Sequence, residues 1–212
     1  MLLPNSEEYG LLYTDEFGDF VGLDEVQLLD PPLESRIPAL SKMLNSTDPY
    51  ISYQAVLVLT AWGKDIGLKQ LKEMLITGEI TTFTLSPNRI TGEDNVYDEL
   101  SYAVHLYGLS GGDQNKIFEL YIKFLEIYPY NFFESKLKYS LLKSKFKELY
   151  PFVEKAVVET LAEGRIYQAS QLLPVLTKLE PKKGAGRVQK FKSLPGIAFG
   201  VEANIKEALE YR

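Results

Sequence analysis

The sequence contains no cysteine and only one histidine, His105. The lack of cysteine excludes disulfides and cysteine-based zinc sites, and a single histidine leaves too few good ligands for a typical zinc centre. No apolar run approaches the roughly 18 residues that a membrane-spanning helix needs. The first residues also lack the basic segment of a signal peptide. We therefore expect a cytoplasmic protein with no membrane segment, no metal and no other cofactor.

Basic residues are missing from the first 35 positions, which hold nine acidic residues. The other positions hold 20 acidic and 23 basic residues, and the whole chain has a net charge of −6. Segregated charge creates a local field that steers oppositely charged partners. The acidic segment therefore faces either a basic partner or basic helices of its own chain, and the sequence leaves both interpretations open.

Aromatic residues are interleaved with these acids in EEYGLLYTDEFGDF, residues 7–20. Their spacing fits one face of a helix, but Gly10 and Gly18 would each cost about 1 kcal/mol in a helix interior. We therefore favour a short non-helical or hairpin arm, with YGLLY and FVGL as its strands. Four exposed rings would form an adhesive patch, so we expect them to be buried.

Beyond this arm, the apolar spacing is helical. Asp30-Pro31 is expected to begin a helix that Pro38 kinks or ends, and Asp48-Pro49 to begin a second helix that Gly63 ends. Later helices are expected over 65–76, 96–109, 114–127, a lysine-rich segment ending near 146, 149–162, 166–179 and 201–209. The segment 77–95 is rich in Thr, Gly, Pro and Asn and predicts a long loop or a hairpin insertion, whereas 181–200 reads as irregular.

Two helical segments resemble each other. AVLVLTAWG, from Ala55, and AVHLYGLSG, from Ala103, lie 48 positions apart and share the pattern Ala-Val-x-aliphatic-x-x-x-x-Gly. A period near 40–47 residues, built from helix pairs, is typical of α-solenoids. An insertion between the two copies explains the longer spacing.

The segment from residue 36 to residue 63 resembles the HEAT repeat unit. The resemblance rests on Pro38, Leu40 and Leu44 in its first helix, on the Asp48-Pro49 turn, and on the register of Ile51, Ala55 and Leu59. The family often has an arginine just after the turn, where this chain has Ser52. The resemblance implies an all-α, right-handed α-solenoid of antiparallel helix pairs. The expected single domain, 1–212, comprises the arm (1–30), helix pairs (31–180, with the insertion at 77–95) and a basic loop with a final helix (181–212).

No catalytic set stands out in the sequence. His105 lies within a helical pattern and is expected to be structural. KKGAGR, residues 182–187, lacks the Gly-Lys-Ser/Thr ending of a phosphate loop. Lysine clusters at 136–147 and 182–192 lie near aromatic residues, as in some nucleic-acid-binding surfaces, but the chain is acidic overall and we do not expect nucleic acid as the partner.

A small acidic helical chain without a catalytic set resembles the immunity proteins of bacterial contact-dependent or polymorphic toxin systems. The resemblance implies a non-enzymatic scaffold, monomeric when free, that covers the active site of a cognate basic, nuclease-type toxin. The expected partner-binding residues are Glu7, Glu8, Tyr9, Tyr13, Asp15, Glu16, Phe17 and Asp19 in the arm, and Glu93, Asp94 and Asp98 in and after the insertion. One alternative is a HEAT-like DNA glycosylase using Trp62, Tyr102 and Asp98. The other is a generic adaptor.

Overall fold

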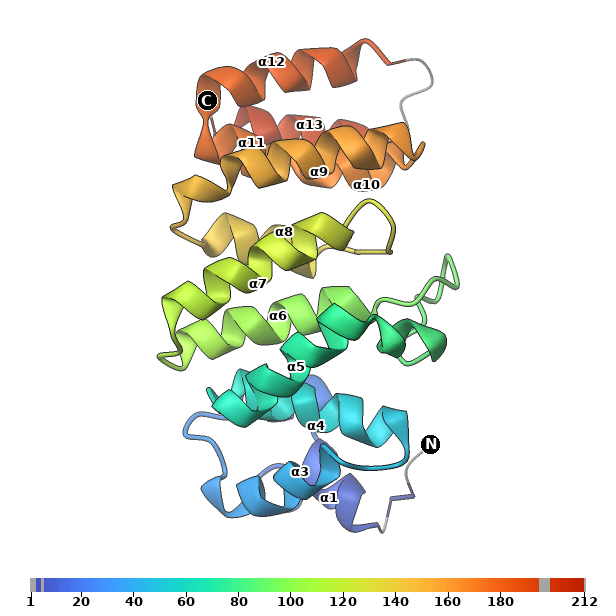
Figure 1. Cartoon of the computed structure of the whole chain (residues 1–212), viewed down its shortest axis with the longest axis vertical. Helices are drawn as coiled ribbons and strands as arrows, with labels where there is room; N and C mark the ends of the chain where they lie inside the picture. Colours follow the sequence, from blue (N-terminus) through green and yellow to red (C-terminus); the bar gives the residue numbers. More distant parts are fainter. Residues whose placement is uncertain (1–2, 5, 195–198, 212) are drawn as a thin grey trace. The chain divides into compact units, whose positions relative to one another are not determined.

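The computed structural model describes residues 3–4, 6–194 and 199–211, and the regular elements in this part of the chain are all helices (Figure 1). Its only β-type pairings are two isolated bridges, Thr14–Phe20 and Pro87–Asp94, and no strand forms among the described residues. The all-α class expected from the apolar spacing is confirmed. None of the described helices is long and apolar enough to cross a membrane.

The chain divides into two compact units, Met1–Ile117 and Phe118–Arg212. The first unit contains 18 acidic and 7 basic residues, a net charge of −11, whereas the second contains 11 acidic and 16 basic residues, a net charge of +5. Residues 1–35 alone hold nine acidic and no basic residues, so they account for −9 of the −11 and the acidity is concentrated at the start of the first unit. A single domain over 1–212 stays a prediction.

Within its described residues, the first unit holds six α-helices and two short 3-10 helices. They are α1 (Glu7–Tyr13), α2 (Leu23–Gln27), η1 (Glu34–Arg36), α3 (Ile37–Met43), α4 (Pro49–Ala61), α5 (Asp65–Thr77), η2 (Glu79–Thr82) and α6 (Val96–Leu109). The next helix, α7 (Gln114–Ile127), begins in this unit and continues into the second.

The described residues of the second unit also form only helices. Its elements are α8 (Lys136–Lys143), η3 (Lys147–Leu149), α9 (Tyr150–Ala162), α10 (Ile166–Gln171), α11 (Leu173–Leu179), α12 (Pro181–Lys192) and α13 (Phe199–Leu209). Helix α11 packs on α12 and α13, which also contact each other.

Helix α4 is the centre of the first unit, where it packs on α2, α3, α5 and α6 (Figure 1). Its residues 52–61 are all buried, so it has no solvent-facing stripe, as expected for a helix enclosed by neighbours. Asp48 caps it by accepting the N–H of Tyr50 at 2.9 Å, and Pro49 takes the first helical position. The start and end predicted from Asp48-Pro49 and Gly63 are confirmed.

Three helix ends share one backbone geometry. Gly63, Gly111 and Gly164 follow α4, α6 and α9, and all three have positive φ angles, of 72°, 84° and 76°. In each case the residue after the glycine returns its N–H to a carbonyl five residues back: Lys64 to Leu59, Gly112 to Tyr107 and Arg165 to Thr160. Such a turn closes a helix and needs a left-handed residue, which glycine supplies without strain. The sequence match between AVLVLTAWG and AVHLYGLSG is therefore also a match of local structure.

Two prolines lie at helix starts that the sequence analysis did not predict. Pro38 lies in the first turn of α3, so the expected helix does not start at Asp30-Pro31, and Pro38 neither kinks nor ends it. Pro174 lies in the first turn of α11, which separates α10 from α11 at Leu172 and divides the continuous helix expected over 166–179. In both places proline lacks an N–H that the first turn does not use.

The arm, residues 1–30, was expected to be non-helical or a hairpin, and this is wrong for two parts of it, because residues 7–13 and 23–27 are helical. Residues 7–13 form α1, capped by Ser6, whose hydroxyl accepts the N–H of Tyr9 at 3.2 Å. Gly10 lies inside α1 and Gly18 lies outside it, so only one of the two glycines carries the helical cost. Between α1 and α2, the segment TDEFGDF (residues 14–20) makes a tight turn that is closed by the Thr14–Phe20 bridge.

The insertion over residues 77–95 is a long loop, which is one of the two structures predicted for it. It contains the short η2 helix and the isolated Pro87–Asp94 bridge. By contrast, the irregular structure expected over 181–200 is wrong for its first twelve residues, which form α12. Gly184 in α12 lies against α11 so closely that an added Cβ would lie 2.5 Å from Thr177 Cα. Phe199 and Gly200 begin α13, so the prediction is also wrong there, whereas 195–198 lie outside the described residues.

Candidate functional site

The turn of the N-terminal arm is held by Asp15. Its Oδ1 accepts the backbone N–H groups of Phe17 and Asp19, both at 2.9 Å. The backbone N–H of Asp15 donates to the Asp19 carbonyl, also at 2.9 Å, and Gly18 adopts a positive φ of 86°. Asp15 was expected to face a partner, but this oxygen is used to brace the arm's own backbone.

Arg36, the first basic residue of the chain, holds the arm through backbone oxygens. Its Nη1 donates to the carbonyls of Leu11 and Thr14, at 3.2 and 2.7 Å, and its Nη2 donates to the Asp15 carbonyl at 2.6 Å. A cation at the carbonyl end of α1 is favourable because those groups carry partial negative charge. Burial lowers the pKa of Arg36, while the nearby carboxylates of Asp15 and Glu16 oppose that shift.

Three rings of the arm form a stacked group. The ring centroid of Tyr9 lies 5.1 Å from that of Tyr13 and 6.0 Å from that of Phe20. The Tyr13 hydroxyl donates to Gln54 Oε1 at 2.8 Å and lies 3.4 Å from the Tyr50 hydroxyl, both on α4. Burial, followed by the Tyr50 hydrogen bond, raises the pKa of Tyr13. Tyr13 is therefore an anchor between the arm and α4.

The opposite side of the arm is open to solvent. Phe17 and Phe20 are exposed at 81% and 66% of their surfaces, so the expectation that all four rings are buried is wrong for these two. Glu16 and Asp19 flank Phe17 and are exposed too. Within the described residues, neither carboxylate forms an ion pair with this chain. We call Glu16, Phe17, Asp19 and Phe20 the arm surface.

The other predicted arm residues lie beside this surface. Glu7 and Glu8 occupy the first turn of α1, where carboxylates are favoured by the helix dipole. Glu7 is exposed, and Glu8 and Tyr9 are half-buried. Both glutamates also line an open groove of about 350 Å³ between α1 and α3 that includes Leu11 and Met43.

Of the three acidic residues predicted as a second contact surface around the insertion, only some are exposed to solvent. Asp98 is fully buried within α6, so it does not face solvent and we withdraw it from the predicted contact set. Asp94 is half-buried and accepts the N–H groups of Leu85 and Ser86, both at 2.8 Å, which folds the insertion back on itself. Glu93 is exposed.

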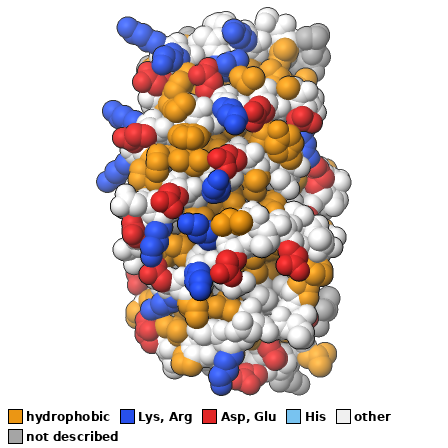
Figure 2. Space-filling model, in the orientation of Figure 1, with side chains coloured by type: hydrophobic (Ala, Val, Ile, Leu, Met, Phe, Trp, Pro, Cys, Tyr) orange, Lys and Arg blue, Asp and Glu red, His pale blue; other side chains and the backbone are white. Residues whose placement is uncertain are grey.

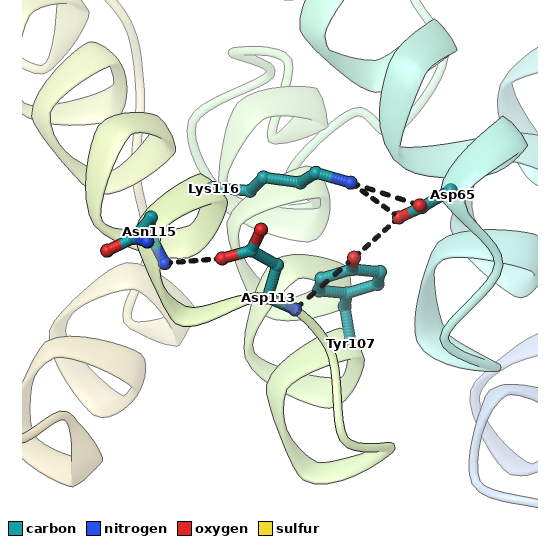
Figure 3. Close-up of polar contacts among 5 residues, drawn as sticks. All are labelled: Asp65, Tyr107, Asp113, Asn115 and Lys116. Carbon is teal, nitrogen blue, oxygen red and sulfur yellow. Dashed lines mark hydrogen bonds and ion pairs between the residues drawn. The ribbon is translucent and has the colours of Figure 1, made fainter.

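A polar network links the turn after α4 to the turn after α6 (Figure 3). Tyr107 donates its hydroxyl proton to Asp65 Oδ1 at 2.6 Å, and Lys116 Nζ lies 3.0 Å from both carboxylate oxygens of Asp65. Asp113 receives the N–H of Asn115 at 2.8 Å and so caps α7. The Tyr107 hydrogen bond and then Lys116 lower the pKa of Asp65. The residues are structural, because they satisfy one another's hydrogen-bonding groups.

Sequence reasoning missed this network, although one signal was present. Asp65 and Asp113 lie 48 positions apart, the same offset as Gly63 and Gly111. The offset places an aspartate at the equivalent point of both turns. Only the folded structure shows that Asp65 accepts a hydrogen bond from Tyr107, which belongs to the second of the two similar segments.

The residues considered for an enzyme do not form an open site. Trp62 is buried and its indole N–H donates to the Val26 carbonyl at 2.8 Å, while Asp98 is buried within α6. Tyr102 is half-buried and stacks on His105 at 6.0 Å between ring centroids. Within the described residues, no group of three or more His, Cys, Asp or Glu side chains is placed to hold a metal ion.

Several basic residues of the second unit are engaged by their own unit. Lys138 pairs with Glu207 and donates to Asn204 at 3.0 Å, Arg187 pairs with Glu154 at 2.9 Å, and Lys183 lies 4.9 Å above the Tyr150 ring. KKGAGR is part of α12 and not a phosphate-binding loop. On the face drawn in Figure 2, both signs of charge are interspersed among hydrophobic side chains, with no continuous basic stripe.

Comparison with known proteins gives no relative for this chain: no family model, curated protein or solved structure matches it. The candidate site therefore rests on the residues and contacts described above.

Proposed function

We propose that the chain is a non-enzymatic scaffold whose arm surface binds a basic partner protein. The observation that carries this proposal is the exposure of Phe17 and Phe20 beside Glu16 and Asp19, on a turn held rigid by Asp15 and Arg36. Aromatic anchors contribute much of the energy of protein interfaces, and a turn that is ordered before binding loses little entropy when it binds.

Charge supports a basic partner. The first unit has a net charge of −11, and within the described residues Glu16 and Asp19 of the arm surface form no ion pair, although Arg36 lies near Glu16. Such a field accelerates association with a cationic protein and penalises acidic ones. Arg36 donates its hydrogen bonds to carbonyls and forms no ion pair with these carboxylates, so a single nearby cation does not balance the arm's charge.

The partner class that fits best is a nuclease-type toxin, which would make the chain an immunity protein of a contact-dependent or polymorphic toxin system. A nuclease needs a cationic cleft for nucleic-acid phosphates, and an acidic surface with aromatic anchors can occupy such a cleft. A cytoplasmic location and a monomeric free state belong to the same proposal.

The scaffold itself is proposed to be a right-handed HEAT-like α-solenoid of antiparallel helix pairs. The recurring glycine turn at Gly63, Gly111 and Gly164 supports this arrangement, because each turn ends a helix with the same backbone hydrogen bond. Tyr107 and Asp65 add a bond between two of these turns.

The test is direct titration of the full chain with a basic, nuclease-type toxin domain, and one encoded by a neighbouring gene would be the first candidate. The double variant Glu16→Gln/Asp19→Asn and the single variant Phe17→Ser should each weaken binding by about tenfold, as loss of an interface anchor does. The matched control Glu202→Gln/Glu210→Gln removes two exposed carboxylates from α13 and its end and should bind as the unaltered chain does. Equal affinity of all variants would reject the arm surface as the binding site.

A competing outcome is DNA binding by the chain itself. Retarded migration of duplex DNA at low salt would favour the glycosylase alternative and argue against a basic protein partner.

A further inference from the structure

A second groove lies in the first unit, away from the arm surface. It has a volume of about 390 Å³ and is bounded by the first turn of α4, the last turns of α5, and η2 with the segment that follows. Its apolar lining includes Met74, Ile80 and Phe83, and Phe83 is 41% exposed. An apolar side chain entering this groove would therefore be covered without displacing any core residue.

The charge of the groove is of one sign. Glu73 and Glu79 line it, and no lysine or arginine does. The lysines of the same helix, Lys69 and Lys72, lie outside the lining residues. Within the described part of the chain, Glu73 and Glu79 form no ion pair.

The backbone adds to this negative potential. Helix α5 ends at the groove, with Gly78 in the left-handed conformation donating its N–H to the Met74 carbonyl at 3.2 Å. The carbonyl end of a helix is partially negative and is usually balanced by a basic residue, but the last turn of α5 contains none. Glutamates on either side of this end make the arrangement unfavourable until a cation binds.

We propose that this groove receives a segment of the basic partner in which a lysine or arginine stands next to an aliphatic side chain. The cationic head lies between Glu73 and Glu79, and the aliphatic groups lie against Met74, Ile80 and Phe83, since long basic side chains cover apolar surface with their stems. This inference rests on the proposed function and adds a second contact, distinct from the arm surface.

The chemistry of the groove selects against other occupants. Two carboxylates and a helix carbonyl end repel phosphate, so nucleic acid does not fit. An acidic peptide is repelled in the same way, and an uncharged apolar ligand leaves the negative potential unbalanced.

The test uses a probe of defined chemistry rather than the partner. The acetylated and amidated peptide Gly-Lys-Leu-Lys-Leu-Gly is titrated into the full-length, ¹⁵N-labelled chain, with the peptide in which both lysines are glutamate as the control. We expect amide shifts at Gln70, Thr77 and Ser52, and none from the glutamate peptide. The variant Glu73→Gln/Glu79→Gln should raise the dissociation constant about three- to tenfold, because two surface ion pairs are lost.

The matched variant Glu16→Gln/Asp19→Asn separates this inference from the proposed function. It removes two carboxylates from the arm surface and should leave binding of the probe unchanged. If the arm variant weakens probe binding and the groove variant does not, the groove inference fails while the arm proposal stands. Absence of shifts around the groove, or equal binding of the glutamate peptide, also overturns the inference.

Discussion

Arg36 donates a hydrogen bond to the backbone oxygen of Asp15 across 2.6 Å but makes no ion pair with the Asp15 carboxylate among the described residues. Arg36, the first basic residue of the chain, therefore binds the acidic arm through backbone carbonyl groups. The arm is fixed, and its outward-facing carboxylates keep their charge for another molecule.

Replacing Arg36 by alanine should destabilise the chain by about 1–3 kcal/mol, because several carbonyls at the end of α1 lose a charged donor. The measurement is urea unfolding followed by circular dichroism. The control Arg89→Ala removes an exposed arginine from the insertion and should change stability by less than about 0.5 kcal/mol. Equal effects of the two substitutions would show that Arg36 does not hold the arm.

Two glycines of the second unit should respond to alanine in opposite directions. Gly164 has a φ of +76° and nothing within 4 Å of an added Cβ, so alanine there carries only the backbone cost, about 1–2 kcal/mol of destabilisation. Gly186 lies within α12, also with open space, and alanine there should stabilise by about 0.5–1 kcal/mol. Thermal unfolding of the two variants distinguishes these signs. Destabilisation by Gly186→Ala would contradict a helical α12.

The elements that the sequence predicted well have their signals in adjacent residues. Helix α4 starts at Asp48-Pro49 because the carboxylate and the ring both suit a helix start, and α6 covers the predicted 96–109. In α4 the cap, the apolar pattern and the closing glycine agree, and in α6 the apolar pattern and the closing glycine agree, so local signals are enough to choose the structure.

The elements that the sequence did not predict depend on contacts between distant residues. Helix α12 contains two glycines and many lysines, so its sequence predicts irregular structure. In the fold, Gly184 lets α12 pack closely on Thr177 of α11, a contact that the local sequence does not reveal. The α1 helix tolerates Gly10 because Ser6 caps one end and Arg36, 26 positions beyond Gly10, binds the other. Burial of Asp98 and exposure of Phe17 likewise depend on the packing of whole helices, which spacing alone does not determine.

Alkaline pH should destabilise the chain through its buried tyrosines. Burial, together with the hydrogen bond to Glu154, raises the pKa of Tyr150 from 10.0 to about 12. The unfolded tyrosine ionises near pH 10 while the folded one keeps its proton, so stability is complete below pH 10 and falls as the pH rises toward 12. The loss from one tyrosine is about 1.4 kcal/mol per pH unit in this window.

The variant Tyr150→Phe isolates that contribution. Free energies of unfolding measured between pH 9 and pH 11.5 should fall less steeply in the variant than in the unaltered chain. An identical slope in both proteins would mean that Tyr150 does not contribute to the alkaline loss.

The central claim is that the arm surface attracts and anchors a basic protein, and the ionic-strength dependence of the association rate tests it most directly. The full chain and its Glu16→Gln/Asp19→Asn variant are mixed with the basic toxin domain that the titration above identifies as a partner, over a range of salt concentrations. The account predicts that the unaltered chain associates faster at low salt and loses rate more steeply as salt rises, because its field is screened within about 10 Å at 0.1 M. Identical rates and identical salt slopes for the two proteins would contradict the account.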